Sequence, residues 1–285
     1  MRKCYEGKNK MKIFKPTIGG HDGSSFRELI DMWGEAGYCE VIKSNKTTGH
    51  YSDQTLYPEA RPWVNKVGDI MLYDNPILDK LHDNLNWKMA LWSNVVHRGE
   101  NSYPWTFWPK HPKIHAKVVS KGIKKYDDRE GTSVFIGRYT TPKRQSLLVE
   151  QELWAHAIEF FWLGRDHNAN LCTNEAYLEI LNNHKFGLCV PGVGPKCLRD
   201  MELIGLGTVP IFTPGVSCEY YEPLERNKHF LFANNPTEVK EVIESCTKEK
   251  WEYISNQCRE WYERNVSPKG SYELTMKIIE THYKK

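Results

Sequence analysis

The segment Lys185–Phe212 constrains the fold more than any other part of the sequence. It opens with a continuous apolar run over 186–190, which is typical of a strand buried in a parallel sheet. A stretch rich in glycine and proline follows at 191–195, and then come a helical pattern over 198–206 and a second apolar strand over 209–212. A strand, a glycine loop, a helix and a strand in this order predict a doubly wound α/β sheet.

The same alternation extends over the whole chain. Further strands are predicted at 11–15, 39–43, 69–73, 87–92, 133–137 and 230–232, and helices at 24–36, 147–163, 174–181, 236–247, 248–264 and 270–282. Ser24 and Ser25 can cap the first of these helices, and Gly37 stands where its C-terminal cap belongs. With 285 residues, the chain fits two modest domains, and a charged stretch that ends at Gly131 marks the boundary. We therefore predict two Rossmann-like domains, at 1–130 and 131–268, followed by a terminal helix at 269–285.

Composition excludes several classes of protein. Hydrophobic residues make up 40% of the sequence and charged residues 26%, which is typical of a globular chain. A net charge of +3 is too weak to favour a nucleic-acid partner. The eight cysteines form no Cys-x-x-Cys pair and no cluster with zinc spacing, so we expect reduced thiols. No apolar run approaches the ~20 residues that span a bilayer, and no signal peptide opens the chain. These features predict a cytoplasmic protein without a membrane span.

The glycine loop is a candidate phosphate site. Pro191, Gly192 and Gly194 lead directly to a helix N-terminus, where backbone N–H groups and the helix dipole favour an anion. Arg199 adds positive charge in the first turn, as does the nearby Lys196. Glu202 lies one turn later on the same face, where a carboxylate accepts hydrogen bonds from ribose hydroxyls. The alternative is an Arg199–Glu202 surface ion pair beside an ordinary loop.

This segment resembles the donor-site signature of exostosin-like glycosyltransferases of the GT-B class. In that family a Lys-Phe-x-Leu strand and a Pro-x-Gly loop lead to a helix with Arg-x-x-Glu, and then to Gly-x-x-Pro-Val/Ile. The matching residues are Lys185, Phe186, Leu188, Pro191, Gly194, Arg199, Glu202, Gly207, Pro210 and Ile211. Cys197 and Leu198 replace the usual small polar residue before the arginine. The resemblance covers roughly 133–270.

What the resemblance implies goes further than the residue pattern. It implies a donor-binding C-terminal domain, an acceptor-binding N-terminal domain and a last helix that crosses back onto the N-terminal domain. Within the family, the chain is most similar to small sugar transferases of chlorella viruses that include a xylosyltransferase. The resemblance therefore implies UDP-xylose as the donor, a glycan hydroxyl as the acceptor, and the host cytoplasm as the location.

A second segment also resembles the family. Gly137 and Arg138 end a predicted strand, and Lys143 and Arg144 follow in a basic loop, as in the first strand and loop of a GT-B donor domain. The sequence contains no Asp-x-Asp motif, which argues against a diphosphate held by a metal ion. We therefore expect Arg138, Arg144 and Arg199 to neutralise the diphosphate without a metal cofactor. A solvated basic loop is the alternative.

The general base that deprotonates the acceptor is expected in the N-terminal domain. Asp74 directly follows a predicted strand and is the first candidate, although it is also a good helix N-cap. Asp22 and His21 in the first glycine-rich turn come next, and His97 after them. The aromatic loop 103–108 either stacks on an acceptor sugar or packs in the core.

The sequence thus predicts an inverting, metal-independent glycosyltransferase. One alternative is a Rossmann-type enzyme that uses NAD or S-adenosylmethionine, but no Gly-x-Gly-x-x-Gly follows the first strand, since Gly19–Gly23 does not fit. Another is a non-catalytic module that binds nucleotides or glycans.

Overall fold

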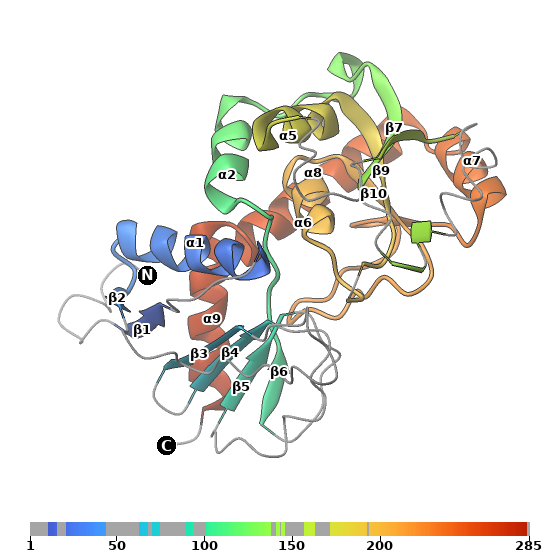
Figure 1. Cartoon of the computed structure of the whole chain (residues 1–285). Coiled ribbons are helices and arrows are strands. Elements are labelled where there is room, and N and C mark those ends of the chain that lie inside the picture. The colour runs from blue at the N-terminus through green and yellow to red at the C-terminus, as the bar shows by residue number, and fades with distance from the viewer. Residues whose placement is uncertain are drawn as a thin grey trace.

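The chain has two α/β halves and a helix that connects them. In a computed structural model, the described residues are 11–15, 21–43, 63–67, 70–74, 89–93, 101–137, 141–142, 144–145, 157–162, 172–192 and 194–283. Figure 1 shows strands β1 to β6 in one half and β7, β9 and β10 in the other, with α8 in the second half and α9 against the first. The predicted α/β class is therefore confirmed.

The C-terminal half is built on a parallel sheet of five described strands, in the order β11-β10-β9-β7-β8. They are β7 (Gly131–Gly137), β8 (Glu159–Trp162), β9 (His184–Cys189), β10 (Val209–Phe212) and β11 (Leu231–Phe232). Strands β9 and β10 are almost wholly buried because helices cover both faces of a parallel sheet. The chain moves from β7 to β8 in one direction and then from β9 to β11 in the other, which is the order of a doubly wound flavodoxin-like sheet.

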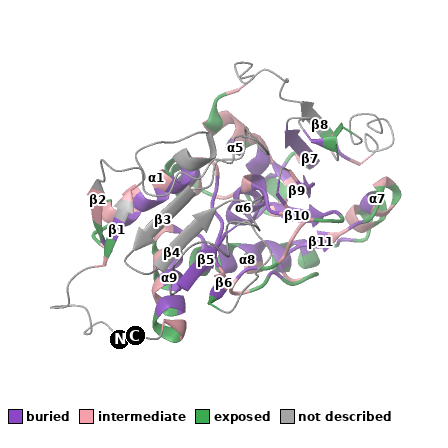
Figure 2. Cartoon of the chain, turned by 60° about the horizontal axis from the view of Figure 1, so that its bottom comes forward, coloured by how far each residue is buried: buried purple, intermediate pink, exposed green. Residues whose placement is uncertain are grey.

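The described helices of this half are α5 (Asn174–Asn183), α6 (Leu198–Gly205), α7 (Pro236–Glu244) and α8 (Lys248–Asn265). Helix α6 ends as predicted, because Gly207 adopts a left-handed φ of 63° that a glycine accepts without strain. The short 3-10 turn η2 (Tyr126–Asp128) precedes the half. Figure 2 shows burial through α6 and β9, and the buried residues of α8 pack against them, where the main core lies.

The N-terminal half has two adjoining sheets. Strands β1 (Lys12–Lys15) and β2 (Glu40–Lys43) pair in parallel around α1 (His21–Glu35). A second sheet has the order β3-β4-β5-β6, with strands β3 (Trp63–Val67), β4 (Ile70–Asp74), β5 (Met89–Trp92) and β6 (Ser102–Pro104). Strands β4, β5 and β6 run parallel, and only the β3–β4 pair is antiparallel. The carboxyl ends of three strands therefore meet at one edge of this sheet.

The last helix, α9 (Pro268–His282), returns to the N-terminal half, as the resemblance implied. Trp33 Nε1 donates to Ser271 Oγ at 3.0 Å, and Trp105 Nε1 donates to Thr275 Oγ1 at 2.8 Å. Ile278 packs in the same apolar cluster as α1. The hydrogen bonds fix the position of α9 on the N-terminal half, and the apolar contacts provide most of the burial.

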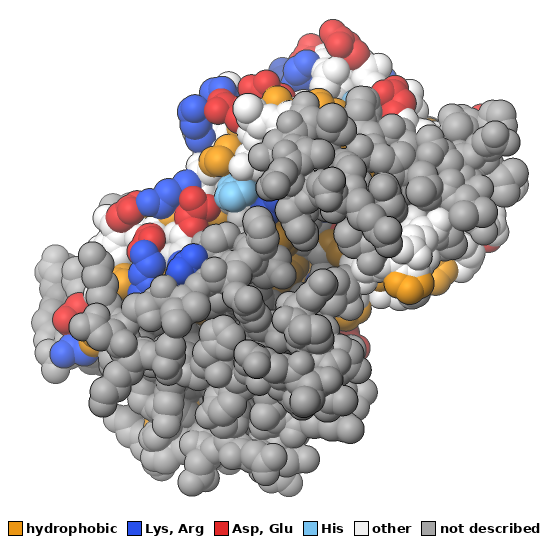
Figure 3. Space-filling model, in the orientation of Figure 1, with side chains coloured by type: hydrophobic (Ala, Val, Ile, Leu, Met, Phe, Trp, Pro, Cys, Tyr) orange, Lys and Arg blue, Asp and Glu red, His pale blue; other side chains and the backbone are white. Residues whose placement is uncertain are grey.

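Helix α2 (Pro112–Lys121) joins the halves on the surface. Lys113 forms an ion pair of 2.6 Å with Glu35 of α1, and both Lys117 and Lys121 pair with Glu175 of α5. Figure 3 shows acidic and basic side chains interspersed along this edge. Exposed pairs of this kind contribute about 0–1 kcal/mol each, so they set orientation more than stability.

Three predictions about local structure are wrong. The helix predicted over 147–163 does not reach its predicted end, because 159–162 is strand β8. Its residues 147–156 lie outside the described part. Helix α1 starts at His21, so that His21 and Asp22 belong to its first turn and not to a loop. Ser25, expected as the helix cap, instead donates its hydroxyl to the Lys110 carbonyl. Helix α2 and strands β3 and β6 were not predicted as such.

Candidate functional site

The carboxyl ends of β7 and β9 form the point where the strand order of the C-terminal sheet reverses. Their register pairs Ser133 with Phe186 and Val134 with Gly187, which brings Gly137 level with Val190. Ligands of open α/β sheets bind in the crevice outside such a switch point. The two loops predicted to bind a diphosphate follow these two strands, so the topology places them side by side.

Arg199 lies across the end of β7. Its guanidinium carbon is 4.2 Å from the ring centroid of Phe135, in a cation–π contact. The side chain is only 7% exposed, and its Nε and Nη1 atoms are buried without a hydrogen-bond partner among the described residues. Burying a cation and leaving its N–H donors unpaired both cost free energy. An anionic ligand would neutralise the charge and accept hydrogen bonds from the donors.

Arg144 approaches the same place from the segment that follows β7, where residues 144 and 145 are helical and not in the expected loop. Its Nη2 atom donates to Cys197 Sγ at 3.4 Å, and a Cβ added to Gly192 would lie 3.1 Å from the same Nη2. The pKa of Arg144 is lowered by burial and by the nearby charge of Arg199. Two arginines that repel each other thus meet at the switch point, as an anion site requires. We call Arg144 and Arg199 together the arginine crevice, after the position where ligands of such sheets bind.

The N-terminus of α6 already holds a carboxylate, which sequence reasoning missed. Asp200 Oδ2 accepts from the Cys197 backbone N at 2.8 Å in a capping box. Burial raises the pKa of Asp200 to about 6, while Arg199 and Arg144 act to lower it. The carboxyl group therefore neutralises part of the helix dipole, so the arginines and not the helix end offer the main attraction for an anion. An Asp three residues after the cap was the available sequence signal.

Glu202 is buried and bonded on both oxygens. Oε1 accepts from the Lys110 backbone N at 2.9 Å, and Oε2 accepts from the Tyr177 hydroxyl at 2.7 Å. Burial raises the pKa of Glu202, and burial with the adjacent Glu202 also raises that of Tyr177, which keeps the phenol protonated as a donor. Glu202 thus connects the N-terminal half to α5, and a ribose would have to share its oxygens. Nothing in the sequence singled out Tyr177.

Lys196 does not point its charge at the arginine crevice as expected. It is 2% exposed, and its Nζ donates to the backbone carbonyls of Ser93, at 2.8 Å, and Glu219. The expectation fails because the loop turns this side chain toward the N-terminal sheet.

The aromatic loop after β6 packs in the core. Trp105 and Trp108 are fully buried, Phe107 is 3% exposed, and Trp108 stacks on Phe26 with ring centroids 5.0 Å apart. Of the two roles left open for this loop, stacking on an acceptor is excluded for these three side chains.

The expected bases lie at different places in the N-terminal half. Asp74 is the last residue of β4, next to the residue pair Tyr73–Trp92 of the β4–β5 ladder. His21 and Asp22 begin α1. The side chains of all three lie outside the described part of the structure, as do Arg138, Lys143 and His97 in full.

The remaining loop residues are placed as follows. Pro191 is buried and directly follows Val190, and the Gly192 backbone N donates to Gly194 O at 3.1 Å in a tight turn. The structure therefore brings together Gly137, Arg144, Pro191, Gly192, Gly194 and Arg199 at the switch point.

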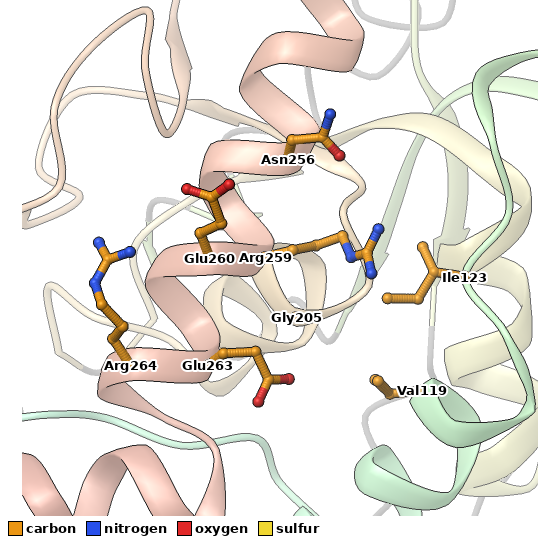
Figure 4. Close-up of a pocket in the computed structure, with 8 residues that line it drawn as sticks. All are labelled: Val119, Ile123, Gly205, Asn256, Arg259, Glu260, Glu263 and Arg264. Atoms are coloured by element: carbon orange, nitrogen blue, oxygen red, sulfur yellow. The ribbon is translucent and has the colours of Figure 1, made fainter. Parts of the chain in front are cut away.

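A separate hollow of about 460 Å³ lies at the opposite end of α6, where Gly205 forms its floor. In Figure 4, Arg259 extends from α8 across this hollow toward Ile123. It contains none of the predicted site residues. Among the described residues, no helix is long and apolar enough to cross a membrane, and no cluster of three metal-ligating side chains occurs.

No protein-family model matches the sequence, and the search of curated proteins gave no match. Solved structures with a similar fold include S. aureus TarM, in a complex with UDP, at 15% identity and a TM-score of 0.43, over 67% of this chain and 44% of TarM. An α1,3-fucosyltransferase has 12% identity and a TM-score of 0.48, over 97% of this chain and 92% of that one. The pneumococcal O-GlcNAc transferase GtfA has 13% identity and a TM-score of 0.40, over 89% and 55%. The chain thus spans less than half of TarM, and we take no residue role from these structures.

Proposed function

We propose that this chain is a glycosyltransferase that takes its sugar from a nucleoside diphosphate donor. The observation that carries the proposal is the arginine crevice, formed by Arg144 and Arg199 at the switch point of the C-terminal sheet. The buried Nε and Nη1 atoms of Arg199 have no acceptor among the residues that the structure describes, and a diphosphate offers oxygens and two or more negative charges.

In this proposal the arginines stabilise the leaving nucleoside diphosphate. As the bond between the sugar and the phosphate breaks, negative charge grows on the phosphate oxygens, and fixed cations nearby lower the barrier. Gly137 and Gly192 let the ligand and the two guanidinium groups approach the strand ends closely. Arg138 and Lys143 belong to the same proposal by sequence, and Glu202 remains the proposed ribose contact.

The acceptor and the base are proposed to come from the N-terminal half. Strands β4 and β5 are parallel neighbours, so their carboxyl ends share one edge, at Asp74 and Ser93. The Ser93 carbonyl accepts a hydrogen bond from Lys196, which lies in the loop between β9 and α6 (the donor loop, because the sugar donor is proposed to bind there). This edge of the sheet therefore faces the donor loop. Asp74 is therefore the first proposed base, ahead of Asp22 and His21.

The finer assignments rest on the family resemblance of the sequence. They are a GT-B glycosyltransferase of exostosin type, UDP-xylose as the donor, a glycan hydroxyl as the acceptor, inversion at the anomeric carbon and a cytoplasmic location. The absence of Asp-x-Asp from the sequence supports transfer without a metal ion.

The test begins with calorimetric titration of the protein with UDP, NAD and S-adenosylmethionine. We expect UDP alone to bind, and Arg199→Ala to weaken UDP by about 10²-fold because a charge-assisted contact is lost. Arg264→Ala, which removes a surface arginine paired with Glu222, serves as the control and should bind normally.

A screen of nucleotide sugars for donor hydrolysis, with chelator present, then identifies the donor. Hydrolysis of UDP-xylose ahead of other donors supports the full proposal. Binding of UDP with no hydrolysis or transfer would leave a nucleotide-binding module, and binding of NAD or S-adenosylmethionine instead would refute the proposal.

A further inference from the structure

Lys196 is a buried cation that bridges the two halves of the chain. Its Nζ donates to Ser93 O at 2.8 Å, at the carboxyl end of β5, and to Glu219 O in the segment that follows β10. It also lies 4.2 Å from the ring centroid of Tyr220. Ser93 is fully buried, so the bridge is inside the protein and not on its surface.

Burial of an ammonium group is unfavourable unless its donors are well satisfied. The two carbonyls and the aromatic face satisfy Lys196, and the loop is fixed further where the Ser217 backbone N donates to Pro195 O at 2.9 Å. Loss of the ammonium group would therefore remove this hydrogen bond between the loop and β5 without removing a residue from the arginine crevice.

Lys196 lies in the loop that leads into α6 and to Arg199, so this bridge can affect the arginine crevice. It directly precedes Cys197, the N-cap of α6, whose Sγ contacts Arg144, and it lies three residues before Arg199. Anion binding at the arginines therefore acts on the same short loop that Lys196 holds against β5.

A second contact with the N-terminal half is made from within α6 itself. Glu202, three residues after Arg199, accepts from the Lys110 backbone N of the N-terminal half. Residues 196, 199 and 202 therefore alternate between the N-terminal half, the arginine crevice and the N-terminal half again. Arg199 therefore lies on α6 between two residues, Lys196 and Glu202, that are both hydrogen-bonded to the N-terminal half.

We propose that Lys196 is a positioning residue that transmits occupancy of the arginine crevice to the carboxyl end of β5, level with Asp74. The bridge itself follows from the contacts, and its link to a bound nucleotide rests on the proposed function. Lys196 touches no substrate in this proposal; it fixes the donor loop relative to the edge where the acceptor would be deprotonated.

The first arm of the test measures hydrogen exchange in the ligand-free protein. In Lys196→Met, exchange over 89–93 and over 194–200 should both rise, by about tenfold, because both ends of the bridge lose the same hydrogen bond. Lys228→Met, which removes an exposed lysine paired with Glu225, should leave both segments unchanged. A rise over 194–200 with 89–93 unaltered would overturn the bridge. If Lys196→Met does not fold, Lys196→Gln, whose amide retains one donor, is measured in the same way.

The second arm adds UDP. In the wild-type protein UDP should slow exchange over both segments, whereas in Lys196→Met bound UDP should slow exchange over 194–200 only. The UDP dissociation constant should change by less than about tenfold, since Arg144 and Arg199 remain. Protection of 89–93 that persists in Lys196→Met overturns the proposal. If UDP does not bind the wild-type protein, the proposed function fails, and the ligand-free arm still decides whether Lys196 couples the two segments.

Discussion

Arg199 lies so close to Gly137 that a side chain on Gly137 would collide with it. A Cβ at this position would be 2.6 Å from Arg199 Nη2 and 2.9 Å from the ring of Phe135. The strand end must therefore carry a glycine for the guanidinium to occupy its place. This contact explains in physical terms why a glycine ends β7 at the switch point.

Gly137→Ala is expected to displace Arg199 and to weaken UDP binding by about tenfold or more, since one charge-assisted contact is misplaced. Gly187→Ala is the matched control, because its Cβ would instead collide with the buried Leu203 side chain. We expect Gly187→Ala to lower the melting temperature, with little change in UDP affinity for the folded fraction. Calorimetry and thermal unfolding of both variants test this, and equal UDP affinity in Gly137→Ala and wild type would contradict it.

Asp200 is expected to compete with a bound diphosphate. Burial raises its pKa to about 6, so the group is ionised at pH 7.5 and largely protonated at pH 5. Asp200→Asn keeps an oxygen for the Cys197 cap and removes the charge, so it should bind UDP about threefold to tenfold more tightly at pH 7.5. The ratio of the two affinities should approach one at pH 5.

The comparison of variant with wild type at each pH cancels the protonation of UDP itself. Asp128→Asn, which removes an exposed carboxylate, serves as the control. Weaker binding by Asp200→Asn at pH 7.5 would show that the carboxylate helps to hold the arginines in place, contrary to this prediction.

The sequence could predict that Arg144 and Arg199 lie close together, because their placement depends on local signals. Buried strands, a glycine loop and arginines that follow adjacent parallel strands are all readable without a structure, and Arg144 and Arg199 do meet. The C-terminal cap of α1 was also readable, since Gly37 has a φ of 74°.

What the sequence could not show are contacts between residues that are distant in the chain. Lysine is a residue type that often binds phosphate, but Lys196 instead donates to the carbonyl of Ser93, which lies 103 residues away in the sequence. Glu202 is likewise bonded to Lys110, 92 residues away. The aromatic residues of 105–108 are equally suited to a sugar or to a core, and tertiary packing decides between them. Helical periodicity also failed at β8, where a four-residue strand is too short to show a period of its own.

His115 makes the fold sensitive to acid. It is fully buried between α6 and α8, with Nε2 at 3.2 Å from Glu202 O and Nδ1 at 3.0 Å from the Tyr262 hydroxyl, and burial lowers its pKa to about 4. The unfolded chain binds a proton here below pH 6.5, and the folded one does not. Stability is therefore complete above pH 6.5 and is lost as the pH falls toward 4, by about 2.5 kcal/mol at pH 4.5.

Urea unfolding of wild type and His115→Gln at pH 7 and pH 4.5 tests this prediction. The variant is expected to lose less stability between the two pH values, although it is less stable at pH 7. His229, with a pKa lowered to about 4, and Asp200 titrate in both proteins, so the difference isolates His115. An equal loss in both proteins would contradict the prediction.

The attachment of α9 is expected to depend on its two hydroxyl contacts with tryptophan. Thr275→Val keeps the shape of the side chain but leaves Trp105 Nε1 buried without its acceptor, which costs about 1–3 kcal/mol of unfolding free energy. Thr281→Val on the same helix is the matched control, since its hydroxyl is exposed and bonds to Lys277 O in its own helix. Urea unfolding followed by tryptophan fluorescence measures both variants. Equal stability of the two would show that apolar burial by Leu274 and Ile278 alone holds α9 in place.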